Sequence, residues 1–123
     1  MADTWCTGEN VLIFACSGGS NVGQISNDAG KKLDQEGVGK LYCLAGVGGD
    51  IPGIVASSKG ADRTIVLDGC AVGCAKAIME KVEAPISCYV VVTEQGVEKG
   101  IHFNITADEI EQTCAAVRSA IAG

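Results

Sequence analysis

The cysteines are the residues of this sequence with the greatest capacity for chemistry, because seven of them occur in a chain of 123 residues. Thiolates bind soft metal ions, exchange disulfides and act as nucleophiles. The odd number argues against a disulfide framework, and the N-terminus lacks the basic segment of an export signal. In a reducing compartment such abundance indicates metal binding, thiol chemistry or burial.

Three cysteines stand where apolar runs end, and such runs predict buried strands. The runs and their cysteines are 10–15 with Cys16, 38–44 with Cys43 and 63–67 with Cys70. The carboxyl ends of parallel strands lie on one edge of a sheet, where ligands bind. Cys74 lies four residues after Cys70 at the start of a predicted helix, and positions i and i+4 share a helix face. We therefore expect Cys16, Cys43, Cys70 and Cys74 to converge.

Four thiolates around one ion are typical of a closed, structural zinc site, so zinc is the favoured metal. An iron–sulfur cluster uses the same ligands, and a disulfide between Cys70 and Cys74 would make the site redox-active. A zinc protein is colourless, whereas a cluster absorbs visible light. These alternatives stay open at the level of the sequence.

The elements that must position the cysteines alternate between strand and helix. Glycine-rich turns follow the strands, and helical spacing places Val22, Ile25, Ala29 and Leu33 on one face before Gly37. A short helix with Asp50 as N-cap is expected before residue 60, and a third with Val72 on its apolar stripe before Pro85. A fourth strand is expected over 86–93, and 94–104 is ambiguous between a turn and a short extra strand.

The last helix is predicted to open with the capping box that begins at Thr106, and to bury Ile110, Cys114, Val117 and Ile121. The alternation predicts an α/β fold with right-handed crossovers. We expect a single three-layer domain over 10–123 with a mostly parallel sheet of four or five strands, in flavodoxin-like or Rossmann-like order. Residues 1–9 are expected to form a flexible tail.

Composition excludes several classes of partner. The net charge of −6 argues against nucleic acid, which is usually bound by a basic stripe. No apolar stretch reaches the roughly 18 residues that span a bilayer. We therefore expect a cytoplasmic protein with neither a nucleic-acid nor a membrane partner. The sequence does not indicate any other partner.

The remaining candidates are weaker. Cys88 and Cys114 fall on apolar positions and are expected in the core, whereas Cys6 is interpreted as an exposed free thiol rather than an accessory ligand. Asp68 is interpreted as a helix N-cap or as a residue that orients the ligand loop. His102 is interpreted as a solvated residue in a polar segment.

The cysteine motifs together resemble one family. Cys16-Ser-Gly-Gly-Ser with Gly23, Cys43-Leu-Ala-Gly, and Asp68-Gly-Cys-Ala-Val-Gly-Cys74 look like the successive motifs of the DGC-domain proteins. Zinc binding through four cysteines is attributed to that family, and its biochemical role is not established. The resemblance implies the same four cysteines as metal ligands, and it does not indicate a chemical reaction.

An enzyme acting through the Cys16 thiolate is the competing hypothesis. The strand, cysteine and small-residue loop resemble the nucleophile loop of low-molecular-weight phosphatases and arsenate reductases, which require C-x5-R. Here Val22 stands at the position of that arginine, and the loop has no basic residue. No catalytic constellation is convincing, so sulfur or anion chemistry at Cys16 stays an alternative to metal binding.

Overall fold

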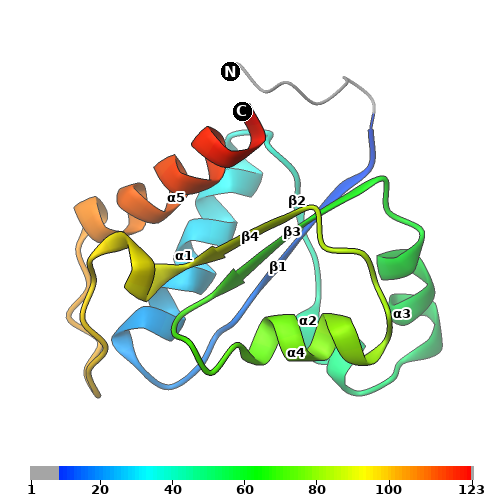
Figure 1. Cartoon of the computed structure of the whole chain (residues 1–123), viewed down its shortest axis with the longest axis horizontal. Coiled ribbons are helices and arrows are strands. Elements are labelled where there is room, and N and C mark those ends of the chain that lie inside the picture. The colour runs from blue at the N-terminus through cyan, green and yellow to red at the C-terminus, as the bar shows by residue number, and fades with distance from the viewer. Residues whose placement is uncertain (1–8, 123) are drawn as a thin grey trace.

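The fold is built on a sheet of four parallel strands, as the sequence predicts. The computed structural model describes residues 9–122. The strand order is β2-β1-β3-β4, so β1 lies between β2 and β3 (Figure 1). Every pairing between neighbours is parallel. The strands are β1 Val11–Ala15, β2 Lys40–Leu41, β3 Arg63–Asp68 and β4 Cys88–Val91.

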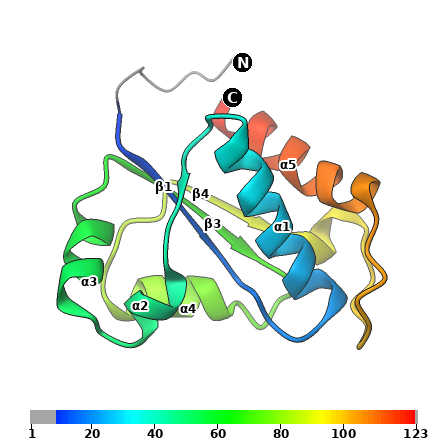
Figure 2. The same ribbon diagram turned by 180° about the vertical axis from the view of Figure 1, so that it is seen from behind.

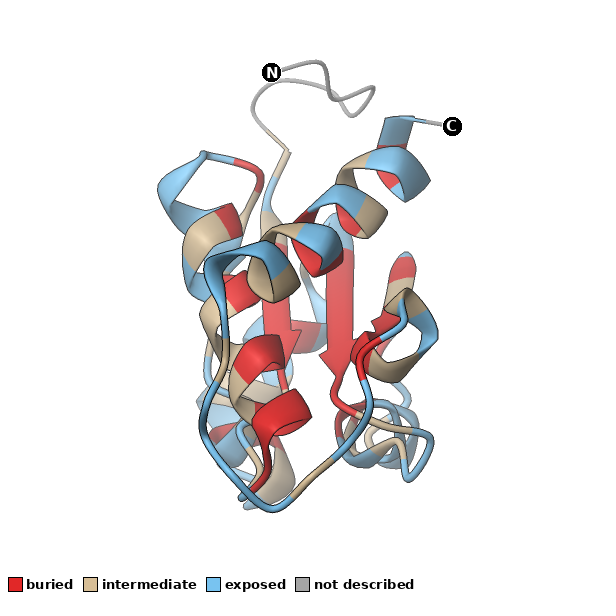
Figure 3. Cartoon of the chain, turned by 90° about the vertical axis from the view of Figure 1, so that its left-hand side faces the viewer, coloured by how far each residue is buried: buried red, intermediate tan, exposed pale blue. Residues whose placement is uncertain are grey.

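Helices cover both faces of the sheet and make three layers (Figures 1 and 2). The helices α1 and α5 pack on one face, and α2, α3 and α4 lie on the other. Because both faces are covered, the central strands are buried on both sides, as Figure 3 shows. The helices are α1 Asn21–Gln35, α2 Leu44–Gly48, α3 Pro52–Lys59, α4 Cys74–Lys81 and α5 Ala107–Ala122, with a 3-10 helix, η1 Val92–Gln95.

Alternating side chains of the strands divide the apolar interior into two cores. Ile13 and Ile65 point toward α1 and α5, where Leu33 and Val117 meet them. Phe14 points to the opposite face and packs with the α2 and α4 side chains. The first helix ends at Gln35 before Gly37, whose φ of 79° suits glycine, as predicted.

The capping box at the start of α5 is confirmed. The Thr106 backbone N–H donates to the Glu109 carboxylate, and the Glu109 N–H donates to the Thr106 hydroxyl. Cys114, Val117 and Ile121 are buried, as the apolar stripe predicts. No helix in the described residues is both long enough and apolar enough to cross a bilayer.

The second strand is much shorter than the run 38–44 predicts. Only Lys40–Leu41 pairs with β1, and the glycine-containing segment expected to be a turn forms the helix α2 instead. Gly46 makes this possible because a Cβ there would lie 2.4 Å from the Ile54 side chain of α3. The turn prediction failed because glycines that serve close helix packing look like glycines of a loop.

The expected N-cap and apolar-stripe positions of two helices are also wrong. Asp50 does not cap α3; it has a φ of 57° and an exposed ion pair with Lys81, while Ile51 occupies the N-cap position. The helix α4 begins at Cys74, so Cys70 lies outside it and the two cysteines do not share a helix face. Val72 belongs to the preceding turn and is 71% exposed rather than in an apolar stripe.

The fourth strand ends at Val91 and continues as η1, and 96–106 forms no strand. Of the tail predicted over residues 1–9, only Glu9 is described, and its carboxylate pairs with Arg63. Cys6 lies outside the described residues.

Candidate functional site

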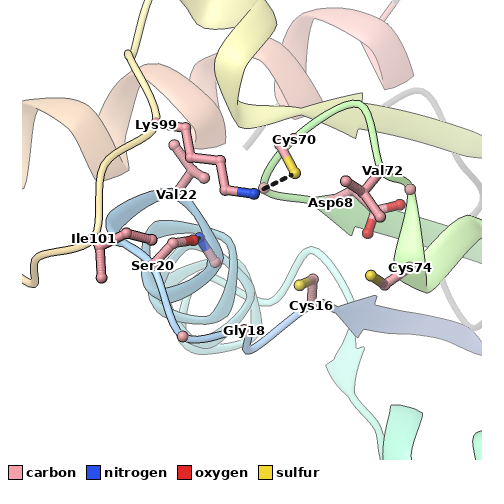
Figure 4. A pocket seen from close by; sticks show the side chains of 14 residues that line it. Cys16, Gly18, Ser20, Val22, Asp68, Cys70, Val72, Cys74, Lys99 and Ile101 are labelled. Atoms are coloured by element: carbon pink, nitrogen blue, oxygen red, sulfur yellow. Dashed lines mark hydrogen bonds between the residues drawn. The ribbon is translucent and has the colours of Figure 1, made fainter.

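Three of the predicted ligand cysteines line one hollow, which we call the thiol pocket (Figure 4). Its volume is about 180 Å³, and Cys16, Cys70 and Cys74 contribute its thiols. The pocket lies beyond the carboxyl ends of β1 and β3, from which α1 and α4 leave to opposite faces of the sheet. This is the topological switch point, where open α/β sheets bind ligands.

Cys16 is a partly buried thiol at the end of β1. The backbone N–H groups of Gly18 and Gly69 donate to its sulfur, while burial, the largest influence, raises its pKa above the ordinary thiol value. Cys74 adds to this rise through its own charge, and Figure 4 shows both side chains directed toward the same part of the pocket. A neutral thiol is therefore favoured at Cys16 when nothing displaces its proton.

Close backbone packing joins the two loops that carry the cysteines. A Cβ at Gly69 would lie 2.8 Å from the Gly23 nitrogen and 2.8 Å from the Val22 carbonyl carbon. A Cβ at Gly23 would lie 2.6 Å from the Gly18 oxygen. Glycine at these positions lets the Asp-Gly-Cys turn rest directly on the first turn of α1, so Cys16 and Cys70 are held on opposite sides of one contact.

Asp68 fixes the second loop by capping α4 from a distance. The helix begins after Gly73, which has a φ of 70° and no side chain to cap it. The Asp68 carboxylate accepts from the Ala75 N–H at 2.8 Å, the Lys76 N–H at 3.0 Å and the Tyr89 hydroxyl at 2.7 Å. Burial and this hydrogen bond raise the pKa of Tyr89, which keeps its hydroxyl a donor. Asp68 is therefore not the N-cap residue of α4, which is Gly73, but its carboxylate accepts backbone hydrogen bonds, as its interpretation as an orienting residue expects.

The pocket also contains a lysine that was not predicted from the sequence. The Lys99 ammonium donates to the Cys70 sulfur at 3.4 Å (Figure 4). Lys99 comes from the segment after η1, far from the cysteine motifs in the chain. Its only sequence signal was a basic residue in a polar segment, which most often means a solvated loop.

Cys43 lies in a different hollow. That hollow is about 340 Å³ and is lined by Ser17, Tyr42 and Ile78 among others. The Cys43 sulfur accepts from the Gly46 N–H at 3.3 Å and so caps α2. Three of the four predicted ligands therefore line one pocket, and Cys43 stands apart because α2 begins directly after it.

The other cysteines and the histidine lie away from the pocket. Cys88 and Cys114 are buried in the core between the sheet and the pair α1 and α5, as predicted. Burial raises the pKa of both thiols, that of Cys114 to about 11, which disfavours the thiolate form of each. His102 is exposed, and its Nδ1 accepts from the Asn104 N–H.

The donor set of the pocket suits a soft metal ion, but its geometry does not enclose one. Within residues 9–122, no three histidine, cysteine or acidic side chains are grouped closely enough to hold a metal ion. Asp68 is not a free donor because both its oxygens accept from α4. Thiolates are ligands that zinc and similar metals prefer, so the chemistry of the three cysteines fits such an ion. The three sulfur atoms would have to move closer together to bind it.

Comparison with known proteins places the chain in a family. The family model described as the DGC domain matches residues 12–117, which includes all four predicted ligand cysteines. The chain is also 34% identical over 101 residues to a Pseudomonas aeruginosa protein named anaerobic and virulence modulator AnvM, covering 82% of this chain and 77% of that protein. No solved structure matches it. The chain belongs to the DGC-domain family.

Proposed function

We propose that this protein binds a soft metal ion, with zinc favoured, through the thiolates of Cys16, Cys70 and Cys74. The observation that carries the proposal is that these three thiols, from two loops far apart in the sequence, line one pocket at the switch point of the sheet. The two buried cysteines have no such arrangement, and each lies among apolar side chains.

The loops around the pocket support the proposal because they are anchored by residues other than the cysteines. The Asp68 carboxylate anchors α4 behind Cys74, and the contact of Gly69 with Val22 anchors the turn before Cys70. Such supporting contacts orient ligands and strengthen metal binding. Drawing the three sulfurs onto one ion then requires movement within the turn 70–73 rather than rearrangement of the sheet.

The electrostatics of Cys16 favour metal binding over a nucleophilic role. Burial raises the pKa of Cys16, and the basic residue that lines the pocket, Lys99, donates to the Cys70 sulfur and not to that of Cys16. A bound metal ion displaces the thiol proton directly, so a raised pKa does not prevent ligation. A thiolate-dependent enzyme at Cys16 is therefore the weaker hypothesis.

Three cysteines leave one position of a tetrahedral zinc ion for a fourth ligand. Cys43 is the candidate within the chain, and joining the set would require its sulfur to leave the amide of Gly46. A molecule from outside the chain is the other candidate. A variant at position 43 distinguishes the two, because only the first loses a ligand.

The test is to measure metal content by mass spectrometry and zinc affinity by chelator competition. We expect one zinc per chain, and a loss of affinity in Cys16→Ser, Cys70→Ser and Cys74→Ser. Cys43→Ser loses affinity only if Cys43 supplies the fourth ligand. Cys88→Ala is the matched control because it removes a cysteine outside the pocket and should bind zinc as the wild type does.

Two results would change the conclusion. A wild-type protein that takes up no stoichiometric metal, in folded and fully reduced form, would overturn the proposal. Visible absorption with iron and sulfide in the same preparation would replace zinc with an iron–sulfur cluster at these cysteines. Substitution with Co²⁺ adds a check, since sulfur-to-metal charge-transfer bands appear only when thiolates coordinate the ion.

A further inference from the structure

Lys99 is a cation without a carboxylate partner beside the thiols. Its ammonium donates to the Cys70 sulfur, and within residues 9–122 no acidic side chain forms an ion pair with it. Asp68, the acidic residue that lines the same pocket, is engaged by α4 and Tyr89. Among the residues that the structure describes, Lys99 is also the one basic residue that lines the pocket. The positive charge is therefore directed at sulfur.

Asn21 holds the backbone on both sides of Lys99. Its side-chain amide donates to the Glu98 carbonyl at 2.8 Å, and its side-chain oxygen accepts from the Gly100 N–H at 2.7 Å. The Asn21 backbone N–H donates to the Gly100 carbonyl at 3.2 Å. Asn21 is 3% exposed, and it begins α1 directly after the Cys16 loop. A single buried amide thus fixes the segment that carries Lys99 against the cysteine loop.

We propose that Lys99, held in place by Asn21, balances the negative charge that the three pocket thiolates acquire when they hold a divalent metal ion. The inference rests on the proposed metal binding. Three thiolates and a divalent ion leave one net negative charge, and one ammonium cancels it. Lys99 also repels the cation, but the thiolates outweigh the ion in charge, so its net effect is to strengthen binding.

The overall charge of the protein does not supply the positive charge that the thiolates need. The chain carries a net charge of −6, so its overall field opposes a further negative charge at the pocket. Lys99 is exposed, so water and salt screen its charge in part, and the direct contact of its ammonium with the Cys70 sulfur makes the charge effective there. A local cation is therefore needed where the thiolates form.

The first test compares three lysine variants by zinc affinity at fixed pH and ionic strength. Lys99→Met should bind zinc about 10-fold or more weakly, which is the size expected when a partner of a ligand is lost. Lys99→Arg keeps the charge and should recover most of the affinity. Lys76→Met is the matched control, because its ammonium lies over the Tyr89 ring, 5.3 Å from the centroid, and outside the pocket.

The second test asks whether Asn21 acts through Lys99. Asn21→Ala should weaken zinc binding in the same direction as Lys99→Met. The double variant should be no weaker than Lys99→Met alone, because the clamp has no further role once the ammonium is gone. A merely structural role of Asn21 would instead make the two losses add.

The outcomes separate this inference from the proposed function. If the wild type binds no zinc, the proposed function fails. If the wild type binds zinc and Lys99→Met binds it equally or more tightly, the function stands and the charge-balancing role is overturned. A loss of the same size in Lys76→Met would also overturn it, since general charge would then explain the effect.

Discussion

The Asp-Gly-Cys motif assigns a different task to each of its three residues. Asp68 holds the start of α4 with its carboxylate, and Gly69 allows the turn to rest on the first turn of α1. Cys70 then supplies the proposed metal-binding atom of the motif, because both carboxylate oxygens of Asp68 are engaged by α4. At the scale of residues, Asp68 and Gly69 therefore position the thiol of Cys70.

Replacing Asp68 by Asn should destabilise the fold, because an amide nitrogen would face an N–H donor of α4. We expect a loss of about 1–3 kcal/mol in the free energy of unfolding, measured by urea denaturation of the metal-free protein. Asp50→Asn is the control, since its ion pair with Lys81 is exposed and should contribute about 0.5 kcal/mol or less. Equal effects in the two variants would contradict the capping role of Asp68.

Replacing Gly69 by Ala should separate the two cysteine loops. The added methyl group would lie 2.8 Å from backbone atoms of Val22 and Gly23, which cannot move aside as a flexible side chain would. We expect a loss of about 1–3 kcal/mol in unfolding free energy and weaker zinc binding. Gly53→Ala, where nothing lies within 4 Å of the added atom, should retain both properties.

Residue types and spacing revealed the thiols of the pocket but not its cation. Cys16 and Cys70 could be predicted because a strand ends beside each, and the core positions of Cys88 and Cys114 followed from apolar patterning. Lys99 could not be predicted, because its position depends on Asn21, nearly eighty residues earlier. No local pattern encodes a hydrogen bond of that sequence separation.

At the scale of elements, the sheet and the long helices follow from hydrophobic patterning, while the short elements do not. The capping box of α5 could be read directly, since Thr106 and Glu109 are close in the sequence and their two reciprocal hydrogen bonds depend on no distant segment. The helix α2 could not be predicted, because it depends on the packing of Gly46 against Ile54. This one missed helix also explains why Cys43 stands apart from the pocket.

A network of charges joins α1 to α5 and should make stability depend on pH. Hydrogen bonds from Arg118 and Lys32 lower the pKa of Glu111 to about 2. A lowered carboxylate pKa stabilises the fold above the ordinary value near 4.5, and this contribution is lost as the pH falls from there toward 2. Arg118 also pairs with Glu36, so the network ties both helices.

We therefore expect Glu111→Gln to lose about 0.5 kcal/mol of unfolding free energy at pH 7, because an exposed network is screened by water. The difference from the wild type should shrink as the pH approaches 2. Urea denaturation over this pH range measures it. Asp28→Asn, which breaks an exposed pair within α1 alone, should have little effect, and a constant gap for Glu111→Gln at all pH values would refute the linkage.

At the scale of the whole molecule, the pocket draws on three separate segments of the chain. The loop after β1, the turn after β3 and the segment after η1 contribute Cys16, Cys70 and Lys99. A ligand held by these segments binds the folded chain more tightly than the unfolded one, in which the segments are apart. Its binding free energy is therefore added to the stability of the fold.

Zinc should raise the melting temperature of the reduced protein, and the rise should grow with the logarithm of the free zinc concentration above the dissociation constant. At a free zinc concentration 100 times the dissociation constant, the stabilisation is about 2.7 kcal/mol. Thermal unfolding followed by circular dichroism, with and without zinc, measures the shift. Cys70→Ser should show a much smaller shift, and an equal shift in both proteins would place the zinc elsewhere.

The contact of Gly69 with Val22 and Gly23 limits how this site can be transplanted. A synthetic peptide that spans Asp68 to Cys74 would carry two thiols and neither of the surfaces that shape their turn. An engineer who wished to move the pocket into another protein would have to move two crossovers of the sheet together, at their native separation. The smallest portable unit of this chemistry is therefore close to the size of the domain itself.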